Sequence, residues 1–229
     1  MTTDPLAAPV LSIGTEMLDA QGNIVDFKHN QFGKFKRAYL PSNSMDELVE
    51  YLDNLDLEWI QPGVGPGQKI DYRRRKGEIA WVDDETVNKY LWGHFVAANE
   101  DPDWKFDIDS LEPVQYSKYS PSDTPEDSNY IMALPDHYEW HNDTLVSMAQ
   151  KDEDRKCRKL SMTLVLTDGY DGGDFECGSL RDGNISSQRL TLEKGEVIIF
   201  PSIMEHRVLP VLSGERRVLV AWAWGPLFK

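Results

Sequence analysis

The sequence has 229 residues and a net charge of −15, from 39 acidic and 24 basic side chains. This negative average field repels nucleic-acid phosphates and anionic membranes, so neither is an expected partner. Hydrophobic residues make up 40% of the chain, enough for one sizeable core. No apolar run of about 18 residues occurs and the N-terminus lacks a signal-peptide pattern, so a soluble cytoplasmic protein is expected. Two cysteines, Cys157 and Cys177, are too few for a disulfide framework and are predicted to be reduced.

The first half of the chain predicts short strands and two helices. Residues 1–42 alternate short apolar pieces with turn signals, which indicates short strands. The segment Ser44-Met45-Asp46-Glu47 fits a capping box and predicts a helix that ends by about Leu57. A second helix is predicted from Asp84 to about Ala98, because apolar residues recur there at helical spacing after an acidic first turn.

Between these helices lies a glycine-rich loop over residues 61–67, without the Gly-Lys-Ser/Thr ending of a phosphate-binding loop. It leads into a basic cluster, Arg73-Arg74-Arg75-Lys76. A run of charges most often forms a solvated strand edge, and that interpretation is favoured. The alternative is that the cluster meets an acidic group of a substrate. His94, in the second helix, is predicted to pack or to lie on the surface rather than to bind metal.

From about Leu111 onward, short apolar runs separated by Gly, Pro and Asp predict an antiparallel β architecture. Eight strands are predicted, the number that a jelly roll needs. They are Val114–Tyr119, Tyr138–Asp143, Leu160–Thr167, Asp174–Cys177, Gln188–Leu192, Val197–Phe200, His206–Leu209 and Arg217–Trp224. A polar, proline-rich loop over residues 120–135 is a candidate lid. We expect helices and short strands over residues 1–110, packed on a jelly-roll core over 111–229 in one structural domain.

The candidate metal ligands begin with His141-Asn142-Asp143. If this segment is extended, His141 and Asp143 project from the same face and present an imidazole and a carboxylate side by side. His206 is the candidate third ligand. Two histidines and one carboxylate on one side of an ion leave its other positions open, as in non-haem Fe(II) oxygenases. The competing interpretation is a structural His and Asp in a jelly roll that has lost its metal, and His137 is a weaker candidate ligand.

Several ordered elements around these residues carry a family resemblance. They are Leu160–Thr167, the turn Asp168-Gly-Tyr-Asp-Gly-Gly173, Gly195-Glu-Val-Ile-Ile-Phe-Pro-Ser202, His206-Arg-Val-Leu-Pro-Val211, Gly214-Glu-Arg216 and Trp222. Together with His141-Asn-Asp143, they resemble the 2-oxoglutarate/Fe(II)-dependent oxygenases, in the prolyl 4-hydroxylase-like branch. The resemblance covers about residues 112–226 and implies a double-stranded β-helix, another name for the jelly roll.

The resemblance implies roles for individual residues. It assigns His141, Asp143 and His206 to the metal, and Arg216 to the 5-carboxylate of 2-oxoglutarate. A planar guanidinium suits that role, because it holds a carboxylate through two parallel N–H bonds and stays charged when buried. Arg217 is the competitor. Adjacent strand residues point to opposite faces, so only one of the two arginines faces the barrel interior.

Two tyrosines are also implied near the co-substrate. One is Tyr138, three residues before His141, and the other is Tyr119, which is preferred to Tyr130. The chain departs from many relatives in two places. Val218 stands where they carry a small hydroxyl residue, and Pro135-Asp136 stands where they carry a glycine.

The activity implied is hydroxylation of an unactivated C–H bond with Fe(II), 2-oxoglutarate and O₂, with ascorbate as a candidate reductant. A prolyl residue in a peptide or protein is the leading substrate, and a free amino acid or other small molecule is the alternative. Two other classes stay open. One is a cupin-like metalloprotein without 2-oxoglutarate chemistry, and the other is a binding module with no catalysis. The oligomeric state is not encoded in any pattern of this sequence.

Overall fold

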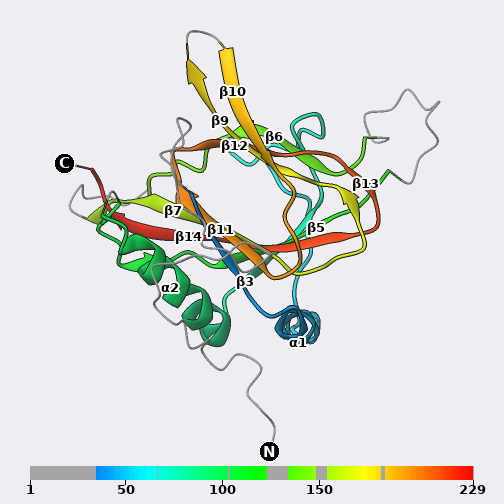
Figure 1. Ribbon diagram of the computed structural model, residues 1–229, viewed down its shortest axis with the longest axis horizontal. Helices are drawn as coiled ribbons and strands as arrows, with labels where there is room; N and C mark the ends of the chain where they lie inside the picture. The colour runs from blue at the N-terminus through cyan, green and yellow to red at the C-terminus, as the bar shows by residue number, and fades with distance from the viewer. Residues whose placement is uncertain are drawn as a thin grey trace, which may run out of the picture.

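The computed structural model of this chain describes residues 35–65, 67–102, 104–122, 134–147, 154–181 and 184–228. Two antiparallel sheets face each other, and both helices lie on the outer side of the larger sheet (Figure 1). Of the sequence predictions, those for residues 1–34 and for 123–133 of the candidate lid lie outside the described residues. Within the described residues, no helix is both long and apolar enough to span a bilayer.

The larger sheet has seven strands in the order β1-β11-β7-β14-β5-β3, with β4 paired to β14. Their bounds are β1 Lys36–Tyr39, β3 Glu78–Val82, β4 Ser110–Leu111, β5 Val114–Tyr119, β7 Lys156–Val165, β11 Glu196–Pro201 and β14 Arg216–Pro226. The early strands β1 and β3 pair with the late strand β11 and with β5. Strands from both halves of the sequence therefore share this sheet.

The smaller sheet has five strands in the order β10-β9-β12-β6-β2, and β8 pairs with β13 in a separate two-stranded sheet. Their bounds are β2 Arg75–Lys76, β6 His137–His141, β8 Asp171–Gly172, β9 Phe175–Arg181, β10 Asn184–Leu190, β12 Glu205–Val208 and β13 Val211–Ser213. The eight predicted strands appear in order as β5, β6, β7, β9, β10, β11, β12 and β14. The two facing sheets form the predicted double-stranded β-helix.

Strand alternation divides the side chains between two cores. Tyr116 and Leu219 pack with the helices on the outer face of the larger sheet. Tyr119 and Val218, on the opposite face of the same strands, pack between the two sheets. Residues that share this inner face therefore line the interior of the barrel. Both cysteines are buried and free, as predicted.

The helices span Ser42–Asp53 (α1) and Glu85–Asn99 (α2). The predicted capping box of α1 is wrong, because the helix begins ahead of Ser44 and its N-cap, Pro41, makes no side-chain cap. Ser44 lies inside the first turn, where its N–H donates to the Pro41 carbonyl at 3.0 Å. The start of α2 is capped by Asp84, whose carboxylate accepts the N–H of Val87 at 2.9 Å.

Candidate metal centre and its surroundings

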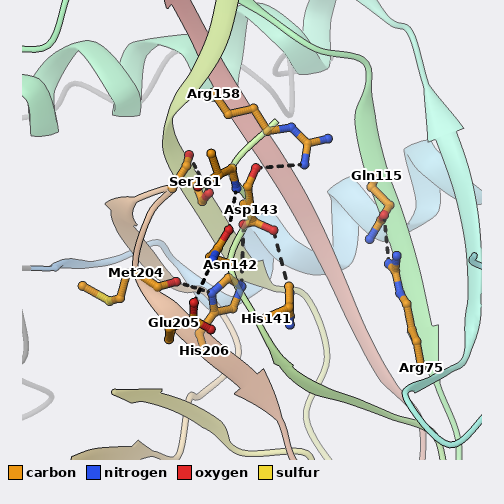
Figure 2. Close-up of polar contacts among 12 residues, drawn as sticks. Arg75, Gln115, His141, Asn142, Asp143, Arg158, Ser161, Met204, Glu205 and His206 are labelled. Atoms are coloured by element: carbon orange, nitrogen blue, oxygen red, sulfur yellow. Dashed lines mark hydrogen bonds and ion pairs between the residues drawn. The ribbon is translucent and has the colours of Figure 1, made fainter. Parts of the chain in front are cut away.

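Three side chains that the sequence singles out converge between the sheets. His141 ends β6 and faces His206 of β12 in the strand register, and Asp143 follows just after β6. The Nε2 atoms of His141 and His206 lie 3.7 and 3.6 Å from the two carboxylate oxygens of Asp143. One ligand atom from each residue lies within 4.8 Å of the others. Figure 2 shows both imidazoles turned toward the Asp143 carboxylate.

Backbone groups hold these side chains in place. Nδ1 of His141 lies 2.7 Å from the Glu139 carbonyl, and Nδ1 of His206 lies 2.9 Å from the Met204 carbonyl. When Nδ1–H donates to a carbonyl, Nε2 keeps its lone pair for the centre. The predicted strand Tyr138–Asp143 is too long, since β6 ends at His141. The Asp143 N–H donates instead to the Ser202 carbonyl at 2.9 Å, which anchors the segment beyond the strand.

The surroundings also set the protonation of the cluster. Burial, followed by the proximity of His206, lowers the pKa of His141 to about 3. Burial alone would raise the pKa of Asp143, but electrostatic interactions with His206, His141 and Arg158 outweigh it and lower that pKa. A neutral imidazole and an ionised carboxylate are the forms in which these side chains bind metal.

A β-bulge brings Tyr138 to the same side as His141. Their partners on β12, Val208 and His206, are two positions apart, whereas Tyr138 and His141 are three apart. The extra residue shifts the alternation, so side chains three positions apart share a face. The Tyr138 ring therefore stacks on the His141 imidazole, with 3.5 Å between centroids and 16° between planes. Burial raises the pKa of Tyr138, which keeps its phenol protonated.

Arg216, at the start of β14, is 1% exposed and points into the barrel. Its Nε, Nη1 and Nη2 atoms are all buried and have no hydrogen-bond partner within the described chain. Tyr119 lies opposite it in the register, and the guanidinium carbon is 5.6 Å from the centroid of that ring. Arg217 instead forms ion pairs with Asp53 and Glu215. The register thus places Arg216 inside the barrel and Arg217 outside it.

The turn at Gly172-Gly173 leaves room for Arg216. Both glycines have positive φ, 76° and 64°, as a tight turn between strands requires. A Cβ atom on Gly173 would lie 2.7 Å from Cδ of Arg216 and 3.0 Å from Cγ2 of Val211. Any larger residue at this position would therefore push the guanidinium away from its place. Val218 follows Arg216 on the inner face and offers no hydroxyl.

The other histidines do not join the cluster. His137 has its ring nitrogens 2.8 and 3.2 Å from the carbonyl oxygens of Pro135 and Arg73, so backbone groups occupy both. His94 is buried in α2 and packs edge-on against Tyr90, at 5.3 Å between ring centroids. Burial lowers the pKa of His94 to about 4. The expected packing role of His94 is therefore what the structure shows, and Tyr130 lies outside the described residues.

Sequence reasoning missed a polar row on β5 and the side chain that it holds. Gln115 and Ser117 share the inner face of β5 and are buried, and the Gln115 amide donates to the Ser117 hydroxyl at 2.7 Å. The alternation of polar residues along this predicted strand was the available signal. Arg75 donates to the side-chain amide oxygen of Gln115 at 3.0 Å. The solvated-edge interpretation holds for Arg73 and Arg74, which are exposed, but is wrong for Arg75, which is buried.

An open cleft in the structure does not coincide with the cluster of His141, Asp143 and His206. A cleft of about 480 Å³ lies along the connections β7–β8 and β10–β11, where it is lined by residues such as Asp168, Tyr170 and Glu193. None of the three clustered side chains lines it. We place the site at the buried donors, because their convergence is a chemical property that an open cleft lacks.

These donors fit a divalent metal and a carboxylate-bearing molecule. Two imidazoles and one carboxylate are the donor set of non-haem Fe(II) sites with open positions. A buried guanidinium without an anion is costly, and a ligand carboxylate would remove that cost. Arg216 is such a guanidinium. The residues present therefore fit Fe(II) together with 2-oxoglutarate.

Comparison with known proteins agrees with this chemistry. A family model described as the 2OG-Fe(II) oxygenase superfamily matches residues 128–224. A PKHD-type hydroxylase of Synechococcus sp. (strain CC9311) is 29% identical over 191 residues, which cover 80% of this chain and 74% of the relative. Another, of Hyphomonas neptunium (strain ATCC 15444), is 39% identical over 74 residues, 31% of each chain.

Solved structures share the fold. A Pseudomonas putida prolyl-4-hydroxylase superposes with a TM-score of 0.56 at 22% identity, covering 82% of this chain and 91% of that one. A Trichoplax adhaerens prolyl hydroxylase, in complex with a peptide fragment of hypoxia inducible factor, superposes with a TM-score of 0.58 at 16% identity. The match covers 85% of this chain and 84% of that one. At such identities the likeness establishes the double-stranded β-helix alone.

Proposed function

Because the chain belongs to the 2-oxoglutarate/Fe(II)-dependent oxygenase superfamily, we propose that it is a dioxygenase that hydroxylates a prolyl residue in a peptide or protein. The curated relatives are hydroxylases by name, which supports the reaction. The prolyl substrate is supported by the names of similar solved structures, which include prolyl hydroxylases. One observation in this chain carries the chemistry. The cluster of His141, Asp143 and His206 lies in the same barrel as a buried, unpaired Arg216.

In this proposal His141, Asp143 and His206 bind Fe(II). The bound metal supplies O₂ activation, with electrons from the oxidative decarboxylation of 2-oxoglutarate to succinate and CO₂. The chain's own contribution is orientation and burial. The backbone carbonyls at both Nδ1 atoms fix the imidazole planes, and the burial of Asp143 and His206 limits access of water.

Arg216 is proposed to hold the 5-carboxylate of 2-oxoglutarate, and Tyr119 and Tyr138 to shape the space beside it. Support for Tyr119 comes from its buried position across the register from Arg216. Support for Tyr138 comes from its ring, which stacks on the imidazole of the proposed ligand His141. We also propose that residues 1–110 and 111–229 act as one structural domain, since β1 and β3 pair within the larger sheet.

The proposal is tested by oxygenation assays on the full chain. Fe(II), 2-oxoglutarate, O₂ and ascorbate are supplied with proline-containing peptides or free amino acids, and succinate release and oxygen gain by mass spectrometry are measured. We expect coupled succinate release and a singly oxygenated peptide. Oxygenation of free amino acids alone would replace the prolyl substrate, and no succinate with any candidate would overturn the assigned chemistry.

The ligand assignment has its own test. His141→Ala, Asp143→Ala and His206→Ala should each abolish iron-dependent conversion of 2-oxoglutarate to succinate. His94→Gln, in α2 and outside the cluster, is the histidine control and should retain turnover. Retained turnover in any of the three ligand variants would refute that assignment. A cupin-like protein would differ at an earlier step, since Fe(II) and 2-oxoglutarate added anaerobically would give no charge-transfer band.

A further inference from the structure

Arg75 reaches from the edge of the smaller sheet into the barrel. It lies on β2, opposite Tyr138 of β6, and is 9% exposed. Its Nη2 donates to Oε1 of Gln115 at 3.0 Å, so the side chain spans from the smaller sheet to β5 of the larger one. Figure 2 shows this pair on the side of the metal cluster away from His206.

The Tyr138 ring separates Arg75 from the metal centre. The guanidinium carbon lies 4.3 Å from the centroid of that ring, and the His141 imidazole stacks on the ring at 3.5 Å. One face of a ring cannot hold both groups at these distances, so the two lie on opposite faces. Arg75 is thus one aromatic layer away from His141. Arg216, in contrast, lies beside Tyr119 at the start of β14.

The charge of Arg75 has no counter-ion in the part of the chain that the structure describes. Its Nε is buried without a hydrogen-bond partner, and Nη2 donates to the Gln115 amide oxygen, which is neutral. Arg158 and Arg207, which also lie near the cluster, are instead paired with Glu112 and Glu176. A buried cation without an anion is costly unless a ligand completes it.

We propose that Arg75 is a binding subsite for a carboxylate of the primary substrate, separate from the arginine assigned to 2-oxoglutarate. A carboxylate fits better than a neutral carbonyl, because only a negative charge neutralises the buried guanidinium. The net charge of −15 repels anionic ligands in general, so an acidic substrate needs such a local cation to bind. The carboxylate belongs either to an acidic side chain next to the target prolyl or to the C-terminus of the substrate. This inference rests on the proposed hydroxylase function.

The test compares matched peptides that differ in one charge. Two carry a prolyl residue beside glutamate or beside glutamine, with both ends blocked, and a third carries the neutral sequence with a free C-terminal carboxylate. Wild type should favour one of the carboxylate peptides by about tenfold to a hundredfold in kcat/KM, the range for a hydrogen bond to a charged group. The favoured peptide identifies the source of the carboxylate.

Arg75→Gln should abolish this preference, and Arg75→Lys should restore part of it. Arg73→Gln removes the same charge from an exposed neighbour and is the matched control, which should keep the preference. Equal kcat/KM for all peptides with wild type, or an equal loss with all peptides in Arg75→Gln, would overturn the subsite. A rise in the KM for 2-oxoglutarate without a change in peptide preference would assign Arg75 to the co-substrate and also overturn it.

A binding measurement separates this inference from the proposed function. The same peptides are titrated by calorimetry into the enzyme loaded with Zn(II) and 2-oxoglutarate, which requires no turnover. Tighter binding of a carboxylate peptide by wild type than by Arg75→Gln supports the subsite even if no peptide is hydroxylated. Equal binding by both proteins refutes it even if prolyl hydroxylation is observed.

Discussion

Replacing Arg216 with methionine should weaken 2-oxoglutarate binding without weakening the fold. The guanidinium is 1% exposed and all three of its nitrogens lack partners in the described chain. A hydrogen bond to a charged group contributes about 1.5–3 kcal/mol, and a guanidinium can donate two to one carboxylate. Losing both should cost about 3–6 kcal/mol, which raises the Kd for 2-oxoglutarate by a hundredfold or more. The metal-free variant should keep or gain stability, because an apolar side chain replaces an unpaired buried cation.

Two measurements check this expectation. Anaerobic titration of the Fe(II) enzyme with 2-oxoglutarate gives the Kd, and chemical denaturation gives the free energy of unfolding with and without the co-substrate. At a concentration of 100 Kd, a ligand that binds only the folded state adds about 2.7 kcal/mol. Wild type should gain this increment, and Arg216→Met should gain almost none at the same concentration.

Arg217→Met is the matched control, because it removes the neighbouring guanidinium from the outer face of the same strand. It should lose stability through its ion pairs with Asp53 and Glu215 but should bind 2-oxoglutarate as wild type does. If Arg217→Met raises the Kd and Arg216→Met does not, the strand register is wrong by one residue. If metal-free Arg216→Met is strongly destabilised, the buried guanidinium has a structural partner and the reasoning fails.

Three further predictions concern the scaffold. Gly173→Ala should raise the KM for 2-oxoglutarate several-fold, since its Cβ would lie 2.7 Å from Cδ of Arg216. Gly169 also has a positive φ, +74°, but a Cβ atom there would have no atom within 4 Å. Gly169→Ala should therefore show only the backbone strain of about 1–2 kcal/mol. Equal KM values for 2-oxoglutarate in the two variants would contradict the contact between residue 173 and Arg216. Burial lowers the pKa of His94 from 6.5 to about 4, so between these pH values the unfolded state binds more protons than the folded state. The contribution of His94 to the free energy of unfolding should therefore fall by about 3 kcal/mol as the pH falls from 6.5 to 4. His94→Leu should not show that fall when the free energy of unfolding is measured by denaturation at each pH. The same pH dependence of stability in wild type and His94→Leu would refute the prediction. Asp84→Ala should lower the free energy of unfolding by about 1 kcal/mol through loss of the α2 cap, whereas Asp83→Ala should not.

The long strands were predictable because their patterns are local. The prediction for Val114–Tyr119 matches β5 at both ends, and the other seven differ from their strands mainly at the ends. The strands β2, β4 and β8 have two residues each, too few for any periodic signal. They form because a neighbouring strand offers hydrogen bonds. That condition depends on tertiary structure and is not written in the segment itself.

The metal ligands were predictable by type and order, but their geometry was not. The sequence predicts an extended His141–Asp143 segment with both side chains on one face, whereas the strand ends at His141 and a bond from Asp143 to Ser202 sets the carboxylate. The bulge in β6 is equally invisible in the sequence. It aligns Tyr138 with His141, since simple alternation would have put these two rings on opposite faces.

The two buried arginines show why composition predicts partners only in part. The chain carries 39 acidic against 24 basic residues, so carboxylates for pairing are plentiful. Even so, Arg75 and Arg216 are buried without a carboxylate in the described chain, while Arg158 and Arg217 have theirs. A shortage of acidic residues cannot explain this difference. An incoming anion can, because a site that already held its own carboxylate would have to break that pair before binding another.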